Sequence, residues 1–145
     1  MSANDLLDAL CARRGIVCAV GAGGKKTTLY RLLRTHPGRV ACTATVFTQV
    51  YPPDLPAHQV VAAPADVVAA VLVAAPVHAK LAFACPSSKP QRNAGLTPEQ
   101  VAECHARGGF DVTLVKADGA RMRPLKAPSE REPNLVSGTT TVLGL

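Results

Sequence analysis

Short apolar runs alternate with stretches of helical periodicity along the whole chain. The apolar runs predict buried strands at residues 16–20, 39–45, 80–85, 111–116 and 139–143. Leucines at helical spacing, or a proline at the start of a periodic stretch, predict helices at residues 4–14, 25–35, 64–75 and 97–107. This alternation predicts a three-layer α/β domain with a mainly parallel sheet covered on both faces. We expect residues 1–145 to form one such domain.

Three polar or glycine-rich segments follow predicted strands directly. They are the glycines after residue 20, residues 43–45 and residues 116–123. Ligands of parallel sheets bind outside the carboxyl ends of the strands. We therefore expect these three segments to line one edge of the sheet.

The first segment has the residue types of a phosphate-binding loop. Glycines permit close approach of the backbone to a phosphate, and the helix start behind them offers free N–H groups and a favourable dipole. Lys25 would reach the terminal phosphates. The strict pattern is broken at two places, because Ala19 replaces the leading glycine and Lys26 replaces the hydroxyl residue that holds magnesium. The alternative is a strand–helix turn that binds nothing, but the order of strand, glycines, lysine and helix favours phosphate. The assigned residues are Gly21, Gly23, Gly24, Lys25, Lys26, Thr27 and Thr28.

The segment after residue 116 combines one carboxylate with several cations. Asp118 stands at the end of a predicted buried strand, where a carboxylate commonly holds magnesium or orients a water molecule. Arg121, Arg123 and Lys126 could clamp phosphate or carboxylate groups. The alternative is a solvated basic loop in which Asp118 only caps a turn, and the pattern alone leaves both interpretations open.

Composition narrows the class of partner. The net charge of +6 suits an anionic partner, although scattered Lys and Arg could also serve solubility alone. Aromatic residues make up 3% of the chain, too few for the stacking platforms that bind nucleic acid.

No apolar run is long enough to cross a membrane, and the acidic N-terminus lacks the basic start of a signal peptide, which predicts a cytoplasmic protein. Five cysteines without a C-x-x-C pair predict reduced thiols, and we assign no metal site built from Cys or His.

Two longer motifs together resemble one protein family. GAGGKKTTLYRLL (residues 21–33) and LVKADGARMRPLKAPSEREP (residues 114–133) are similar to the signatures of YqeC-type proteins. The threonines around Ala44 and the Tyr51-Pro52-Pro53 segment extend the similarity, which covers the chain from about residue 16 onward. The resemblance implies a P-loop-like α/β fold and a role as an accessory protein in the maturation of selenium- or molybdenum-dependent hydroxylases.

The chain departs from the family pattern at two positions that bear on magnesium. Lys26 stands where the family has a threonine or serine, and Lys116 stands where it has the glutamate of its E-A-D-G signature. Both changes add positive charge, which disfavours a dication at the same place. We therefore expect weak Mg²⁺ binding through Thr27 and Asp118, and little hydrolysis.

These observations lead to two hypotheses for function. The first is an accessory protein that binds ATP or GTP. Its NTPase activity would be weak at most and would depend on Asp118. Thr43, Thr45 and the basic residues after Asp118 would contact the substrate or the partner. The alternative is a degenerate, non-hydrolysing module that binds an anionic ligand or an acidic partner. Family members continue well past the E-P motif, so we also expect either a truncated member or one completed by a partner chain, which would be a client hydroxylase or a second copy.

Overall fold

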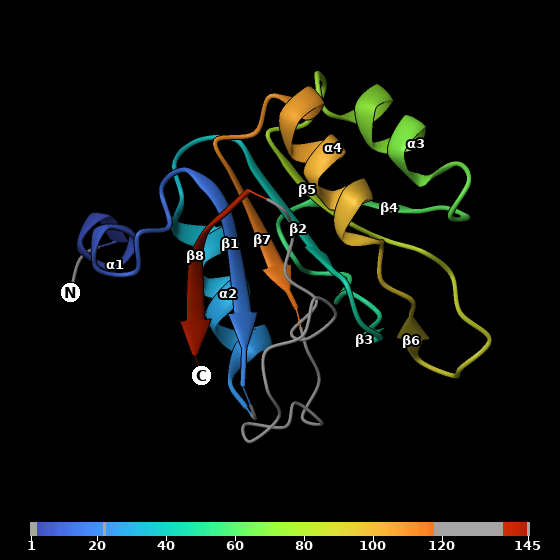
Figure 1. The fold of residues 1–145 in the computed structure, drawn as a ribbon, viewed down its shortest axis with the longest axis horizontal. Coiled ribbons are helices and arrows are strands. Elements are labelled where there is room, and N and C mark those ends of the chain that lie inside the picture. The colour runs from blue at the N-terminus through green and yellow to red at the C-terminus, as the bar shows by residue number, and fades with distance from the viewer. Residues whose placement is uncertain (1–2, 22, 118–137, 145) are drawn as a thin grey trace.

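The computed structural model describes residues 3–21, 23–117 and 138–144. Its helices are α1 (Ala3–Ala9), α2 (Lys25–Thr35), α3 (Val67–Ala74) and α4 (Pro98–Gly108) (Figure 1). Its strands are β1 (Gly15–Val20), β2 (Val40–Ala44), β3 (Thr48–Gln49), β4 (His58–Val61), β5 (Lys80–Ala84), β6 (Arg92–Asn93), β7 (Val112–Lys116) and β8 (Thr139–Gly144).

Six of the described strands form one parallel sheet in the order β4-β5-β2-β7-β1-β8. Strands β1, β2 and β7 lie inside it and are almost wholly buried, which explains why they read as continuous apolar runs rather than alternating ones. The two short strands β3 and β6 pair antiparallel in a separate sheet. The predicted α/β class with a mainly parallel sheet is confirmed.

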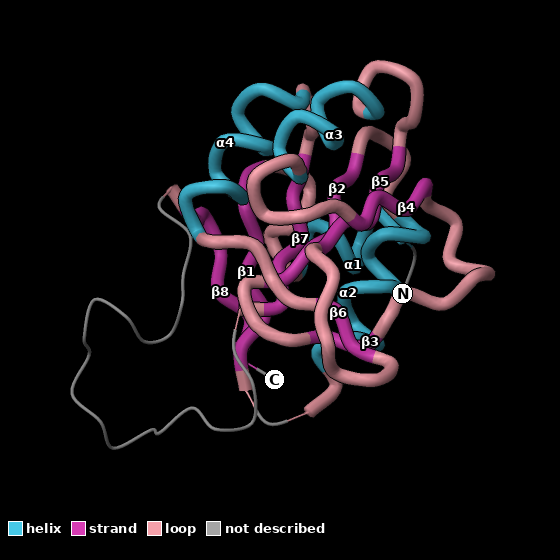
Figure 2. Tube along the Cα trace, turned by 90° about the vertical axis from the view of Figure 1, so that its right-hand side faces the viewer, coloured by secondary structure: helices cyan, strands magenta, loops and turns pink. Residues whose placement is uncertain are grey.

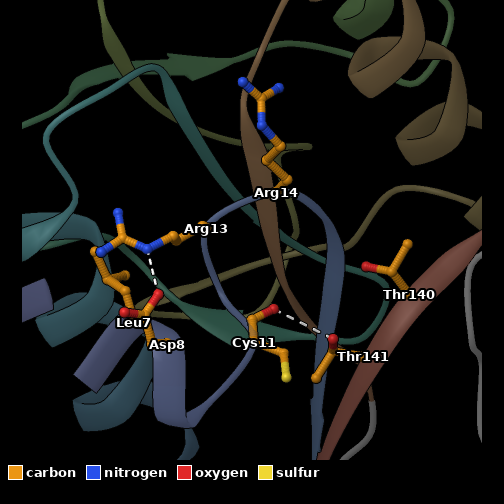
Figure 3. A pocket seen from close by; sticks show the side chains of 7 residues that line it. All are labelled: Leu7, Asp8, Cys11, Arg13, Arg14, Thr140 and Thr141. Atoms are coloured by element: carbon orange, nitrogen blue, oxygen red, sulfur yellow. Dashed lines mark hydrogen bonds and ion pairs between the residues drawn. The ribbon is translucent and has the colours of Figure 1, made fainter. Parts of the chain in front are cut away.

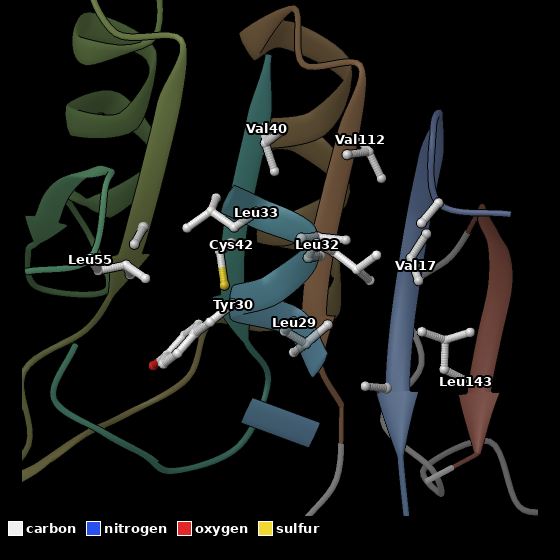
Figure 4. Packing of buried hydrophobic residues seen from close by; sticks show 14 of the residues in the cluster. Val17, Leu29, Tyr30, Leu32, Leu33, Val40, Cys42, Leu55, Val112 and Leu143 are labelled. Carbon is white, nitrogen blue, oxygen red and sulfur yellow. The ribbon is translucent and has the colours of Figure 1, made fainter. Parts of the chain in front are cut away.

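Helices cover both faces of the sheet and create two cores. Alternate residues of each strand point to opposite faces, so Val17 packs with α1 and α2 while Cys18 packs with α3 and α4. Figure 4 shows the first core, where Leu29, Leu32 and Leu33 of α2 lie against the sheet. Figure 2 shows the helix pairs on opposite sides of the strands. The predicted three layers are therefore present.

The helices begin and end where specific residues, such as a capping box or a left-handed residue, fix the backbone. Helix α2 covers the predicted residues 25–35. Helix α4 begins with a complete capping box, in which Thr97 accepts from the Gln100 N–H and the Gln100 side chain accepts from the Thr97 N–H. Helix α1 is shorter than predicted because the chain leaves the helix near Cys11, whose φ of 53° is left-handed.

Other elements differ from the sequence prediction. Helix α3 begins at Val67 rather than near Pro64, because a turn at residues 64–66 precedes it. Strand β4 was not predicted. It lies at the sheet edge, three of its four residues are exposed, and its two valines are adjacent rather than alternating. Strands β3 and β6 have two residues each and fall within segments that read as loops.

Strand β8 lies at the opposite edge, next to β1. Leu143 is buried against the core beneath α2, whereas Val142 on the other face is 48% exposed. The expected fifth strand is thus present, with Leu143 covered by the domain and Val142 left partly exposed.

Arg39 directly precedes β2 and joins this strand to the ends of α3 and α4. Its guanidinium donates to the carbonyl oxygens of Ala75, Gly108 and Gly109, which end α3 and α4. It also lies 5.7 Å from the centre of the Phe110 ring. A cation at two helix C-termini offsets the negative ends of both dipoles.

Replacing Arg39 with Met should therefore lower the free energy of unfolding by about 2 kcal/mol, the usual scale of charge-assisted hydrogen bonds. Urea denaturation measures this value. Arg31→Met is the matched control, because Arg31 is exposed on α2 and its side chain makes no hydrogen bond to the described residues. Equal losses in both variants would contradict the assignment.

Candidate functional site

The carboxyl ends of β1, β2 and β7 meet at one edge of the sheet, as predicted. The Thr45 N–H donates to the Lys116 carbonyl at 3.0 Å, and the Thr45 hydroxyl donates to the Ala117 carbonyl at 3.2 Å. The Ala117 N–H in turn donates to the Ala19 carbonyl at 3.0 Å. Backbone pairing therefore fixes the start of the glycine loop relative to the ends of its two neighbours.

The glycine loop joins the buried strand β1 to the first turn of α2. Gly21 and Gly24 have φ values of 116° and 76°, conformations that glycine adopts without strain. A side chain at Gly23 or Gly24 would meet no atom of the described residues within 4 Å, so the described part of the chain does not fill the space beside this backbone.

The N-terminus of α2 carries no side-chain cap. Gly24 is the N-cap residue, and the Thr28 N–H makes the helical bond to its carbonyl. The N–H groups of residues 25–27 have no intrahelical acceptor, as in the first turn of any helix. Together with the helix dipole they form a favourable environment for an anion.

Lys25 adds a full charge to this environment. Its side chain is only 6% exposed, and its ammonium group donates to the carbonyl oxygen of Gly21. The side chain thus folds back over the loop instead of extending into solvent. The positive helix end and a lysine ammonium group lie on the same short stretch of backbone.

The next three residues of α2 differ in their surroundings. Lys26 is exposed, and its ammonium group donates to the side-chain oxygen of Gln49. Thr27 is exposed in the first turn, and Thr28 is half-buried. The part that each would play toward a phosphate stays a prediction.

The two threonines after the second strand have partners within the protein. Thr43 is buried, and its hydroxyl donates to the Phe83 carbonyl at 2.8 Å, which also accepts the Tyr51 hydroxyl at 2.8 Å. Burial raises the pKa of Tyr51 well above its ordinary value, so its hydroxyl stays a donor. Thr45 is half-buried at the edge itself. Contact of either residue with a substrate stays a prediction.

Sequence reasoning missed the segment at residues 47–49, which borders this edge. The Lys116 ammonium lies 3.4 Å from the Phe47 carbonyl oxygen, and Lys26 reaches Gln49. The two lysines that depart from the family pattern therefore contact the same short segment. No periodicity or motif in the sequence signals this, because both contacts depend on the tertiary fold.

The remaining predicted site residues, Asp118, Arg121, Arg123 and Lys126, lie outside the described residues. Among the described residues, no group of three or more His, Cys, Asp or Glu side chains could hold a metal ion. No described helix is long and apolar enough to cross a membrane.

The cysteines are free thiols, and four of them are buried as predicted for Cys18, Cys42 and Cys85. Burial raises the pKa of Cys42 and of Cys104 to about 12. Both stay protonated at neutral pH, and a protonated thiol is a poor nucleophile. Cys11 is exposed, in the segment between α1 and β1.

A shallow depression of about 410 Å³ lies beside Cys11, between α1 and β8 (Figure 3). Arg13 in its wall is paired with Asp8, and the Thr141 hydroxyl donates to the Cys11 carbonyl at 3.3 Å. The depression adjoins the beginnings of β1 and β8. It is therefore separate from the edge that holds the glycine loop.

Comparison with known proteins gives the family. The model of the family described as "YqeC protein" matches residues 17–145. The chain belongs to the YqeC family. It is 33% identical over 138 residues to the "Uncharacterized protein YqeC" of Escherichia coli (strain K12), a match that covers 92% of this chain. The chain spans about half the length of that YqeC relative, 52%. No solved structure gives a significant match.

The YqeC-type resemblance of the glycine loop and of the later motif is thus confirmed at the level of the family.

The left-handed conformation of Gly24 in the glycine loop can be tested by its effect on stability. Gly24→Ala should lower the free energy of unfolding by about 1 kcal/mol, because a φ of 76° is strained for alanine. Gly23→Ala is the matched control, since the same methyl group enters equally open space at a residue without positive φ. Chemical denaturation of both variants measures the free energy of unfolding. Equal losses in the two variants would contradict the left-handed conformation of Gly24.

Proposed function

We propose that this YqeC-family protein binds a nucleotide, ATP or GTP, through its phosphates at the glycine loop. The observation that carries the proposal is the combination found between β1 and α2. A left-handed glycine precedes an uncapped helix start, and a buried lysine folds over the same loop. Backbone N–H groups, the helix dipole and an ammonium group all favour the same ligand, a phosphate chain.

The charge around the edge supports an anionic ligand. Lys25 and Lys26 open α2 directly after the glycine loop, and Lys116 ends β7, the strand next to β1. Their ammonium groups would offset the charge of a triphosphate directly. The net charge of +6 on the whole chain acts in the same direction.

A phosphate loop of this kind implies Mg²⁺, which requires oxygen ligands in octahedral geometry. Among the described residues of the site, the candidate hydroxyl is that of Thr27, while two of the neighbouring positions are lysines. The candidate carboxylate, Asp118, lies outside the described residues. The described residues therefore do not fit a resident Mg²⁺.

This leaves two forms of the proposal. In the first, the protein is an accessory factor that binds nucleotide and serves a client hydroxylase dependent on selenium or molybdenum, with weak hydrolysis at most. In the second, it is a non-hydrolysing module for an anionic ligand or an acidic partner surface. The ammonium groups of Lys26 and Lys116 favour the second, because they can offset phosphate charge but cannot align an attacking water molecule as a metal ion does.

Lys25→Met tests phosphate binding directly. Methionine keeps most of the buried stem and removes the charge, so the affinity for ATP should fall about 30-fold or more, the equivalent of one charge-assisted bond to phosphate. Isothermal titration calorimetry measures the change. The control is Lys80→Met, because Lys80 contacts the Leu33 and Arg34 carbonyls at the other end of α2 and should not affect ATP binding. Unchanged affinity in Lys25→Met would refute the proposal.

The dependence on magnesium separates the two forms. In the unmodified chain, we expect the dissociation constants of ATP with Mg²⁺ and with EDTA to be nearly equal, because lysines take over the neutralising role of the ion. The double variant Lys26→Thr, Lys116→Glu removes both ammonium groups and should make binding depend on Mg²⁺. Brisk, strictly Mg²⁺-dependent hydrolysis by the unmodified chain would contradict this expectation and rule out the non-hydrolysing form.

A further inference from the structure

Phe47 differs from every other aromatic residue of the chain in its exposure. The chain has three phenylalanines, two tyrosines and no tryptophan. Tyr30, Tyr51, Phe83 and Phe110 are buried, with at most 8% of their surface exposed. Phe47 is 44% exposed and belongs to neither hydrophobic core. Packing among the described residues therefore does not account for a phenylalanine at this position.

The position of Phe47 is fixed relative to the glycine loop. It follows the end of β2 by three residues, and its carbonyl oxygen lies 3.4 Å from the Lys116 ammonium. Two residues further on, Gln49 accepts a hydrogen bond from Lys26, at the start of α2. The segment is thus tied to both sides of the edge at which we place the phosphates.

The backbone next to Phe47 is held by its own small sheet. Thr48 is buried and pairs with Asn93, and the Val50 N–H donates to the Gln91 carbonyl at 3.1 Å. Figure 2 shows β3 and β6 next to each other at the end of the main sheet. An exposed ring on an ordered backbone loses little conformational freedom when a ligand binds.

A cation already lies on the Phe47 ring. The Lys89 ammonium is 3.9 Å from the ring centre, within the range of a cation–π contact. The cation covers one face of the ring, so a base would stack on the opposite face, and a cation at this place suits a ligand that is both planar and anionic. A nucleotide has both properties, since its base can stack on the ring while its phosphates pair with ammonium groups.

We propose that Phe47 is the stacking residue for the base of the nucleotide, with Lys89 beside it. This inference rests on the proposed function and adds how the base is held. Stacking uses the π-face that every base has, so ATP and GTP should bind with similar affinity. Tripolyphosphate, which has the phosphates without a base, should not use Phe47 at all.

Fluorescence of Phe47→Trp gives a direct readout. The chain has no tryptophan of its own, so this variant places a single indole at the proposed stacking position. ATP and GTP should quench its emission as they bind, whereas tripolyphosphate should bind without comparable quenching. Binding of ATP without any change in emission would overturn the proposal.

Affinities of two truncated variants complete the test. Phe47→Ala and Phe47→Leu should each bind ATP and GTP about tenfold more weakly, the scale of one lost base stack, and should bind tripolyphosphate as the unmodified chain does. The leucine variant keeps apolar bulk and so separates stacking from simple hydrophobic contact. Val50→Ala is the matched control, because Val50 is 45% exposed in the same segment and should leave all three affinities unchanged.

The possible failures are distinguishable. Unchanged ATP affinity in Phe47→Ala, with tripolyphosphate still bound, would overturn the stacking role and leave phosphate binding intact. Equal weakening of ATP and tripolyphosphate would show that Phe47 only supports the loop, and would also overturn the inference. Absence of binding of ATP, GTP and tripolyphosphate to the unmodified chain would refute the proposed function and this inference together.

Discussion

Parallel pairing of β2, β7 and β1 is the constraint on which the site depends. Because the three strands run in one direction in register, their carboxyl ends must meet at one edge, whatever the sequence of the loops. Burial of both faces under helices maintains this register. A shift of β1 by one residue would exchange the faces to which Val17 and Cys18 point, and so place each in the other's core. The glycine loop, Thr45 and Lys116 are neighbours for that reason alone.

The sequence predicted the features that local chemistry controls. Helix α2 was predicted with its correct bounds, because glycines precede it and its leucines keep helical spacing. Strands β3 and β6 escaped prediction, since two residues cannot establish a period and each strand exists only through its pairing with the other. The contacts of Lys26 and Lys116 with residues 47–49 escaped for the same reason, because they join segments far apart in the chain. Phe47 lay in a stretch without any motif, so no sequence signal set it apart.

The two lysines give the site a different electrostatic character from that of a metal-dependent loop. In a loop with a hydroxyl and two carboxylates, the protein provides oxygen ligands and the ion provides the positive charge. Here the protein provides the positive charge itself, at Lys25, Lys26 and Lys116. For the proposed phosphate ligand, such a site would favour retention over hydrolysis, because ammonium groups stabilise phosphate in the ground state without organising a nucleophile.

The low aromatic content argues against binding of a polynucleotide but is compatible with binding of a single nucleotide. Binding of a single strand needs aromatic side chains for successive bases, and this chain has one exposed aromatic residue. One ring is enough for one base, provided that it lies within reach of the phosphate site. The segment of Phe47 contacts Lys26 at the start of α2 and Lys116 at the end of β7, which supports the proposed position of the base. The same scarcity that argues against nucleic acid therefore makes the single exposed ring informative.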